Sequence, residues 1–239
     1  MGEITLAFIS IVSVIILFVL YHILSGKRSI AAVIKRYAGS QFSEESIEFT
    51  GEKGTGILFT GILPFIIFVL ILGMHHEKIG LTPGRFTEYW YLYLLLPAVT
   101  APISFYISKS PNIQKRSPQL RIKKWVPRYL LLTAAGWIIY IFGYEFLFRG
   151  ILWFLVYGAF GFWPALIINI FLYSLVHLPQ GKLMTAGAIP IGIIFCFLSH
   201  ITGSFFPSFL IHATMSVSTE FSSFYHNPEF HFQSSTSVK

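Results

Sequence analysis

The chain has 239 residues, of which 54% are hydrophobic and only 11% are charged, with a mean hydropathy of +0.68. This composition excludes an ordinary soluble domain and indicates that a lipid bilayer surrounds the chain. All ten acidic residues are Glu, which excludes catalysis by paired aspartates. The net charge of +7 is concentrated in a few loops, so it indicates membrane orientation and contact with lipid headgroups, with no nucleic acid as partner.

Seven apolar runs predict membrane-spanning helices. Each approaches or exceeds the length needed to cross about 30 Å of hydrocarbon, and in lipid only a helix satisfies the backbone of such a segment. The runs cover residues 5–24, 57–74, 89–108, 129–158, 162–178, 186–201 and 204–224. We therefore predict an all-α polytopic membrane protein of about seven transmembrane helices, with a core bundle formed by the last four.

The basic residues predict how the helices are oriented. If the helices alternate across the membrane, 14 of the 17 basic residues fall on one side. The positive-inside rule then places the N-terminus outside and the C-terminus in the cytoplasm, which fits a multi-pass plasma-membrane protein. The first run has no basic residue before it and is followed by Lys27 and Arg28, so it predicts an uncleaved helix.

Three regions follow from this pattern. Residues 1–128 are expected to hold the N-terminal transmembrane helices and cytoplasmic loops, with an interfacial or cytoplasmic piece at residues 27–53. Residues 129–225 are expected to form a helical core that carries the site. The polar, Ser-containing tail at residues 226–239 is predicted to be disordered.

An acid and a base lie inside one apolar run. Glu145 and Arg149 are four residues apart, so they share a helix face and can pair. An unpaired charge at the bilayer centre costs about 3 kcal/mol on insertion scales, and pairing toward the protein interior avoids that cost. Taken alone, the two residues could be a purely structural ion pair.

Two histidines lie in neighbouring runs. His177 is near the end of its run, and His212 is followed four residues later by Ser216. Glu145 is 16 residues before Gly161 and His177 is 16 residues after it, so an antiparallel hairpin centred on Gly161 brings both to the same depth. We expect Glu145, His177 and His212 to converge inside the bundle.

Such a group of side chains suits hydrolysis. A carboxylate can take a proton from water while one imidazole shares that water, and a second imidazole with a hydroxyl can donate hydrogen bonds to a developing oxyanion. The same Glu and His residues could instead hold a zinc ion and its water. The cofactor therefore stays open between zinc and a metal-free glutamate mechanism.

Three short motifs in this order resemble the CPBP family of intramembrane proteases, also called the Abi family, which includes the CAAX prenyl endopeptidases and bacteriocin-immunity proteins. The motifs occupy residues 144–150, 173–179 and 202–213. The family pattern is Glu-Glu-x-x-x-Arg, then Phe-x-x-x-His, then His-x-x-x-Asn. The resemblance implies that Glu145, His177 and His212 are catalytic and that Arg149 supports them.

This chain departs from the family pattern at three positions. Tyr144 replaces the first Glu, which in the family is thought to activate the water, Tyr173 replaces Phe, and Ser216 replaces the Asn that helps to bind the oxyanion. Neighbouring helix positions differ by about 100°. Glu145 can therefore take the role of the missing Glu only if the helix rotates or unwinds there.

The resemblance implies an intramembrane endopeptidase that cleaves a peptide or membrane-protein substrate near the bilayer. The alternative is a catalytically inactive member that acts as a membrane scaffold or immunity-type protein. A His-Glu-x-x-His zinc motif is absent, because Gly80 stands where the second His would follow His76 and Glu77. The pair His75 and His76 is interpreted as interfacial.

Overall fold

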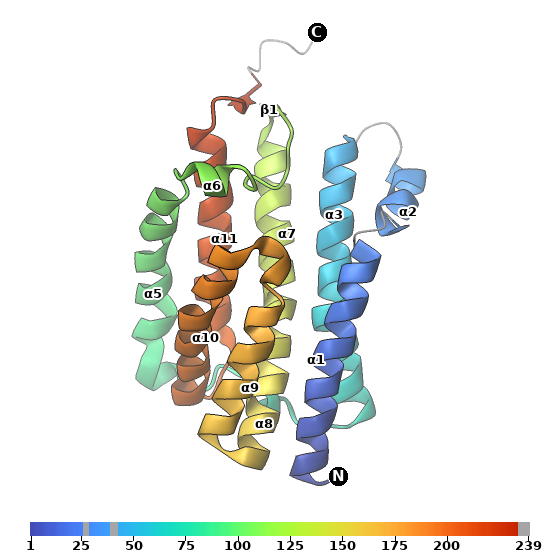
Figure 1. Cartoon of the computed structure of the whole chain (residues 1–239), viewed down its shortest axis with the longest axis vertical. Helices are drawn as coiled ribbons and strands as arrows, with labels where there is room; N and C mark the ends of the chain where they lie inside the picture. Colours follow the sequence, from blue (N-terminus) through green and yellow to red (C-terminus); the bar gives the residue numbers. More distant parts are fainter. Residues whose placement is uncertain (26–28, 39–42, 234–239) are drawn as a thin grey trace.

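The computed structural model describes residues 1–25, 29–38 and 43–233, and this part of the chain is almost entirely helical. The long helices run roughly side by side, and the N-terminus and the C-terminal end of α11 (Phe206–His226) lie at opposite ends of the bundle (Figure 1). The all-α polytopic fold predicted from the sequence is confirmed.

Five helices in the described part of the chain are long and apolar enough to cross a bilayer. Three are single helices, namely α1 (Glu3–Ser25), α5 (Phe86–Ile107) and α10 (Lys182–Thr202). The helix Glu44–Ile71 joins α3 (Glu44–Ile57), η2 (Leu58–Ile62), α4 (Leu63–Phe65) and η3 (Ile66–Ile71). The helix Pro127–Phe160 joins α7 (Pro127–Glu145), η5 (Phe146–Leu152) and α8 (Trp153–Phe160).

The other two predicted spans form helices of a different kind. The apolar helix α9 (Phe162–Leu175) has only 14 residues. The helix α11 (Phe206–His226) has 21 residues but carries His212, Ser216 and Glu220, and it is not among the five apolar spans. Short elements complete the described chain, namely α2 (Ser29–Ala38), η4 (His76–Ile79), α6 (Pro111–Gln114), β1 (Lys124–Trp125), η6 (Leu178–Gln180) and β2 (His231–Phe232).

Two expectations about the ends of elements need correction. The second span begins at Glu44, because residues 44–57 continue the helix and pack against α7. The tail is ordered as far as residue 233, since β2 pairs in parallel with β1 and Phe230 is buried beside Trp125 and Phe224. Residues 26–28, 39–42 and 234–239, on which the rest of these expectations fall, lie outside the described residues.

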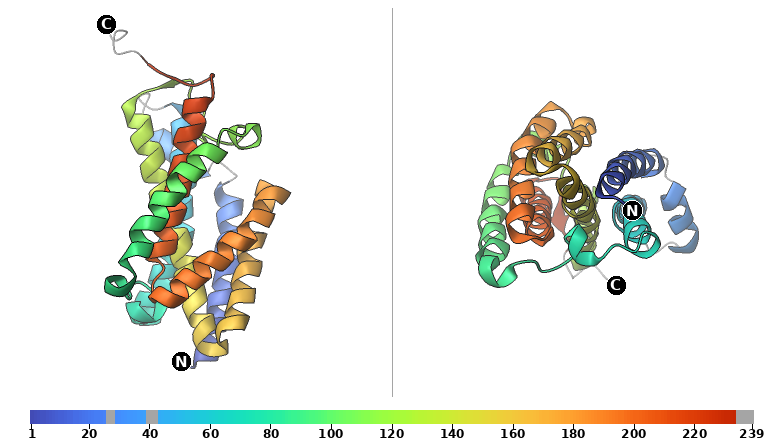
Figure 2. Two further views of the ribbon diagram at one scale, coloured as in Figure 1. Left: turned by 90° about the vertical axis from the view of Figure 1, so that its left-hand side faces the viewer. Right: turned by 90° about the horizontal axis from the view of Figure 1, so that it is seen from below.

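The helix Pro127–Phe160 runs through the middle of the bundle. In Figure 2 it lies between α1 and α3 on one side and α10 and α11 on the other. Its second half is the core of the molecule, where Leu147, Leu152, Trp153 and Val156 are completely buried. Any side chain that faces inward from this helix therefore lies at the centre of the protein.

Two glycines allow the helix Glu44–Ile71 to approach α7 closely. A Cβ at Gly143 would lie 2.8 Å from both Ile57 Cδ1 and Thr60 Oγ1 and 3.0 Å from the backbone nitrogen of Gly61. Small residues at such a crossing let helix backbones pack closely in a membrane, where dispersion and not the hydrophobic effect drives association. This crossing lies next to Tyr144 and Glu145 and fixes their helix.

We predict that Gly143→Ala destabilises the protein by about 1–3 kcal/mol, because the added methyl group overpacks this crossing. The matched control is Gly158→Ala in the same continuous helix, where a Cβ would meet nothing within 4 Å. The control should be neutral or slightly stabilising. Thermal unfolding in detergent micelles measures both, and equal melting temperatures would contradict the close crossing.

Candidate functional site

The helix that carries Glu145 widens immediately after it. Residues 146–152 form a π-helix, in which backbone hydrogen bonds span five residues instead of four. The side chain of Asn169 on α9 donates from Nδ2 to the carbonyl oxygen of Phe148 at 2.8 Å. The widening changes the rotation per residue directly after Glu145. The sequence predicts a rotated or unwound helix at this position if Glu145 is to take the role of the missing Glu. Short π segments of this kind are frequent at functional sites.

Glu145, Arg149 and His212 form a buried charged cluster. Glu145 and Arg149 have no exposed surface, and Arg149 Nη1 lies 3.4 Å from Glu145 Oε2. His212 Nδ1 lies 2.6 Å from Glu145 Oε1, which makes the carboxylate the acceptor and the imidazole nitrogen the donor. The predicted pair therefore forms, and α11 adds the imidazole that the sequence places near it.

The guanidinium of Arg149 is also covered by aromatic rings. Its Cζ lies 3.9 Å from the ring centroid of Tyr173 and 5.3 Å from that of Phe195. Cation–π contacts become stronger when the cation is desolvated. Gly192 leaves room for this arrangement, since a Cβ there would lie 3.1 Å from Tyr173 Cδ1 and 3.5 Å from Arg149 Nη2. Tyr173 thus contacts the supporting cation directly.

His177 joins the site through aromatic contacts. It lies in the turn after α9, where its Nδ1 is 2.8 Å from the carbonyl oxygen of Tyr173. The ring of Tyr144 lies at nearly right angles to both histidine rings, with centroids 6.4 Å from His177 and 5.7 Å from His212. The structure therefore gathers the predicted residues around Tyr144, with direct contact between Glu145 and His212.

Several polar atoms at this site are buried without a hydrogen-bond partner in the described part of the chain. They include Tyr144 Oη, Glu145 Oε2, Asn169 Oδ1 and the three guanidinium nitrogens of Arg149. Buried polar groups in proteins are normally satisfied by protein or by water, and a water needs two to four polar partners. The His212 side chain is 17% exposed, so the cluster meets the surface along α11.

The other predicted oxyanion donor lies one turn beyond His212. Ser216 is half-buried on α11, and residues four apart share a helix face. A hydroxyl at this position can donate one hydrogen bond, as the Asn of the family pattern can.

A zinc ion does not fit Glu145, His177 and His212 as they are placed. Among the described residues, only His75, His76 and Glu77 form a group of three donors whose ligand atoms all lie within 4.8 Å of one another. At the buried site Glu145 already pairs with a guanidinium, which would repel a metal ion. The lone Cys196 lies completely buried in the apolar core.

Sequence reasoning missed Asn169 and a second polar cluster at the end of the bundle that holds α6 and β1. In that cluster Glu220 accepts a hydrogen bond from the backbone nitrogen of Gln119 at 2.7 Å, and Gln119 Nε2 donates to Glu52 at 2.7 Å. The Lys53 ammonium lies 3.4 Å from the ring centroid of Trp137. An Asn or a Glu inside an apolar run is the signal that could have revealed both.

The fold and the site define a polytopic helical membrane protein with a buried Glu–Arg–His cluster in its central helices. Residues 126–218 match the family described as type II CAAX prenyl endopeptidase Rce1-like. This region of the chain is therefore similar to the CAAX protease family, as the motifs predict. No curated protein and no solved structure matches the chain.

We predict that Arg149→Met destabilises the protein by about 3 kcal/mol, because it leaves the buried carboxylate of Glu145 without its guanidinium partner. The double variant Glu145→Gln, Arg149→Met should lose less than the sum of the two single variants. Lys78→Met, at an exposed position, is the control. Chemical unfolding in micelles measures all four variants, and simple additivity would argue against coupling.

Proposed function

We propose that the protein is a membrane-embedded endopeptidase of the CAAX-protease type, which hydrolyses a peptide bond close to the bilayer. The observation that carries the proposal is the 2.6 Å contact between Glu145 Oε1 and His212 Nδ1 inside the matched region. A carboxylate and an imidazole on separate helices, buried beside a guanidinium, are the components that hydrolysis by an activated water requires.

The proposed roles follow from the positions of the side chains. Glu145 Oε2 has hydrogen-bonding capacity left to accept a proton from the attacking water, while Arg149 Nη1 lies 3.4 Å from that oxygen and can pair with the carboxylate. Because Glu145 accepts the hydrogen bond from His212 Nδ1, the other ring nitrogen of His212 can face the substrate carbonyl, and it donates to the oxyanion when both ring nitrogens carry a proton. Ser216 adds a second donor for the oxyanion, and His177 shares the water.

The substrate and the orientation are part of the proposal. The matched family name points to a peptide whose scissile bond lies near a membrane-anchoring prenyl group. The loops with most of the basic residues lie at the end of the bundle that holds α2, α6 and β1 (Figure 1). We propose that this end faces the cytoplasm of a plasma membrane, with the N-terminus outside.

A second function is favoured by Tyr144. Its ring occupies the position where the family pattern has the water-activating Glu, and it is 3% exposed between both histidine rings. In that case Glu145, Arg149 and His212 form a structural lock, and the protein acts as a membrane scaffold or immunity-type protein without cleaving anything.

We expect Glu145→Gln to lower kcat/KM by about 100-fold or more, since it removes the proposed general base. The measurement is cleavage of a farnesylated peptide by the purified full chain in lipid vesicles. Glu220→Gln is the matched control, because Glu220 is also buried but belongs to the second polar cluster. Equal cleavage by wild-type protein and Glu145→Gln would rule out the proposed base.

The scaffold alternative makes a different prediction. If the wild-type chain cleaves no peptide, the double variant Tyr144→Glu, Ser216→Asn should gain measurable cleavage, because it restores the water-activating acid and the oxyanion donor of the family pattern. Its far-ultraviolet circular dichroism and elution volume provide the folding control. A folded double variant that remains inactive would show that the fold does not support this chemistry.

A further inference from the structure

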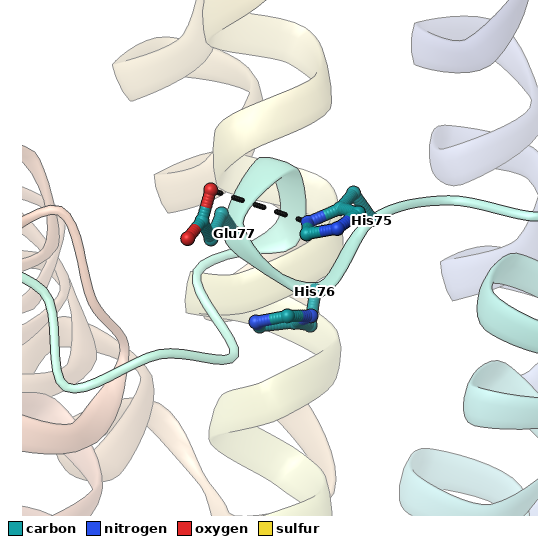
Figure 3. Close-up of side chains that lie close together, drawn as sticks. All are labelled: His75, His76 and Glu77. Carbon is teal, nitrogen blue, oxygen red and sulfur yellow. Dashed lines mark ion pairs between the residues drawn. The ribbon is translucent and has the colours of Figure 1, made fainter.

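Three side chains of types that can bind a metal ion lie together in a part of the sequence far from Glu145 and His212. They are His75, His76 and Glu77, all exposed, and their ligand atoms lie within 4.8 Å of one another. Figure 3 shows the two imidazole rings one above the other, with the Glu77 carboxylate beside them. This is the only such group among the residues that the structure describes.

The backbone explains why adjacent residues can act together. On a regular helix, neighbouring side chains diverge by about 100° and cannot bind one ion. His75 is in an extended conformation, with φ −67° and ψ 136°, and precedes the 3₁₀ helix that starts at His76. The change in conformation places the two rings nearly parallel, with centroids 4.5 Å apart and an interplanar angle of 28°.

The turn that carries these residues is held firmly. Gly80 ends the 3₁₀ helix with φ +64°, and its carbonyl oxygen accepts a hydrogen bond from the backbone nitrogen of Phe205 at 3.3 Å. Ile79 is completely buried, and its carbonyl oxygen faces Gly150. The Cα positions of the three donors are therefore fixed, and their exposed side chains need only rotate to close on an ion.

The donor set selects the kind of ion. Two imidazoles and one carboxylate are the ligands of many zinc sites with an open position, and they favour borderline divalent ions over Mg²⁺ or Ca²⁺, which prefer oxygen. Ligands on a tetrahedral zinc ion lie about 3.4 Å from one another at bond lengths of about 2.1 Å. His75 Nδ1 and Glu77 Oε2 are already 4.0 Å apart.

We propose that His75, His76 and Glu77 form a binding site for a divalent transition-metal ion such as Zn²⁺. The site is independent of the proposed peptidase activity, because the buried residues Glu145 and His212 take no part in it. A bound ion cross-links three side chains of the turn at residues 75–80 and so makes this turn more rigid. The turn already contacts Phe205, the residue before α11.

The test is Zn²⁺ binding to the full-length protein in detergent micelles, purified through a tag that contains no histidine and stripped with a chelator. Isothermal titration calorimetry should give one Zn²⁺ per chain and no heat with Mg²⁺. His76→Ala should weaken binding by about tenfold or more, since one of three protein ligands is lost. His231→Ala, at an exposed position on β2, should bind as the wild type does.

Two results would overturn the proposal. One is wild-type binding no tighter than that of the double variant His75→Ala, His76→Ala. The other is loss of binding in Glu145→Gln while the double variant keeps it, because the ion would then be at the buried site. Because His75 and His76 are exposed, the double variant should fold normally, and its melting temperature without zinc should match that of the wild type. A lower melting temperature would identify misfolding as the cause of lost binding.

Discussion

A charge pair that cannot reach water governs the centre of this molecule. Glu145 and Arg149 are completely buried in a helix that itself lies in the middle of the bundle. Each charge has to be satisfied by protein, and the surrounding elements supply the partners, with His212 from α11 on the carboxylate and Tyr173 from α9 on the guanidinium. Around this part of the helix, α9 and α10 pack against η5, and α11 packs against α7.

The same interaction serves both candidate functions. As a lock, it adds a charged connection between helices that also pack by dispersion and form interhelical hydrogen bonds, such as that from Asn169 to Phe148. As the proposed catalytic unit, it holds a carboxyl group and an oriented imidazole away from bulk solvent, where electrostatic interactions are strong. What separates the two functions is whether a water and a peptide can reach Glu145 beside the ring of Tyr144.

Much of the fold follows from composition, because a bilayer allows few solutions for a long apolar run. All seven predicted runs coincide with helices, and the Glu145–Arg149 pair follows from spacing alone. The sequence predicts only that His212 lies near Glu145. It does not predict their direct contact, because the distance between them depends on how α11 packs. The extension of α3 back to Glu44 was not predictable, because its polar residues are satisfied by partners distant in the sequence, such as Gln119 for Glu52.

Other features have no signature in the sequence. In the π-helix at residues 146–152, the carbonyl oxygen of Phe148 accepts a hydrogen bond from Asn169 on α9, and no residue pattern within the π-helix itself indicates this partner. The convergence of His75 and His76 depends on a local change of backbone conformation that their adjacency does not indicate. Both features depend on how these segments pack against other helices, and the hydrophobic periodicity of a single sequence does not indicate that packing.

The widened turn also divides the central helix into two straight parts whose side chains are rotated relative to each other about the helix axis. The part before residue 146 faces α3 and α11, whereas the part after residue 152 faces α1 and α9. Because a π segment holds one residue more than the α-helix of the same length, removing a single residue between 146 and 152 would let the hydrogen-bond ladder close normally. After removal of a residue other than Arg149, the two parts would lose their difference in phase and could not both keep these neighbours, whereas Glu145 and Arg149 would still be three or four residues apart on one helix face. The extra residue at this turn therefore determines which helices pack around each half of the central helix.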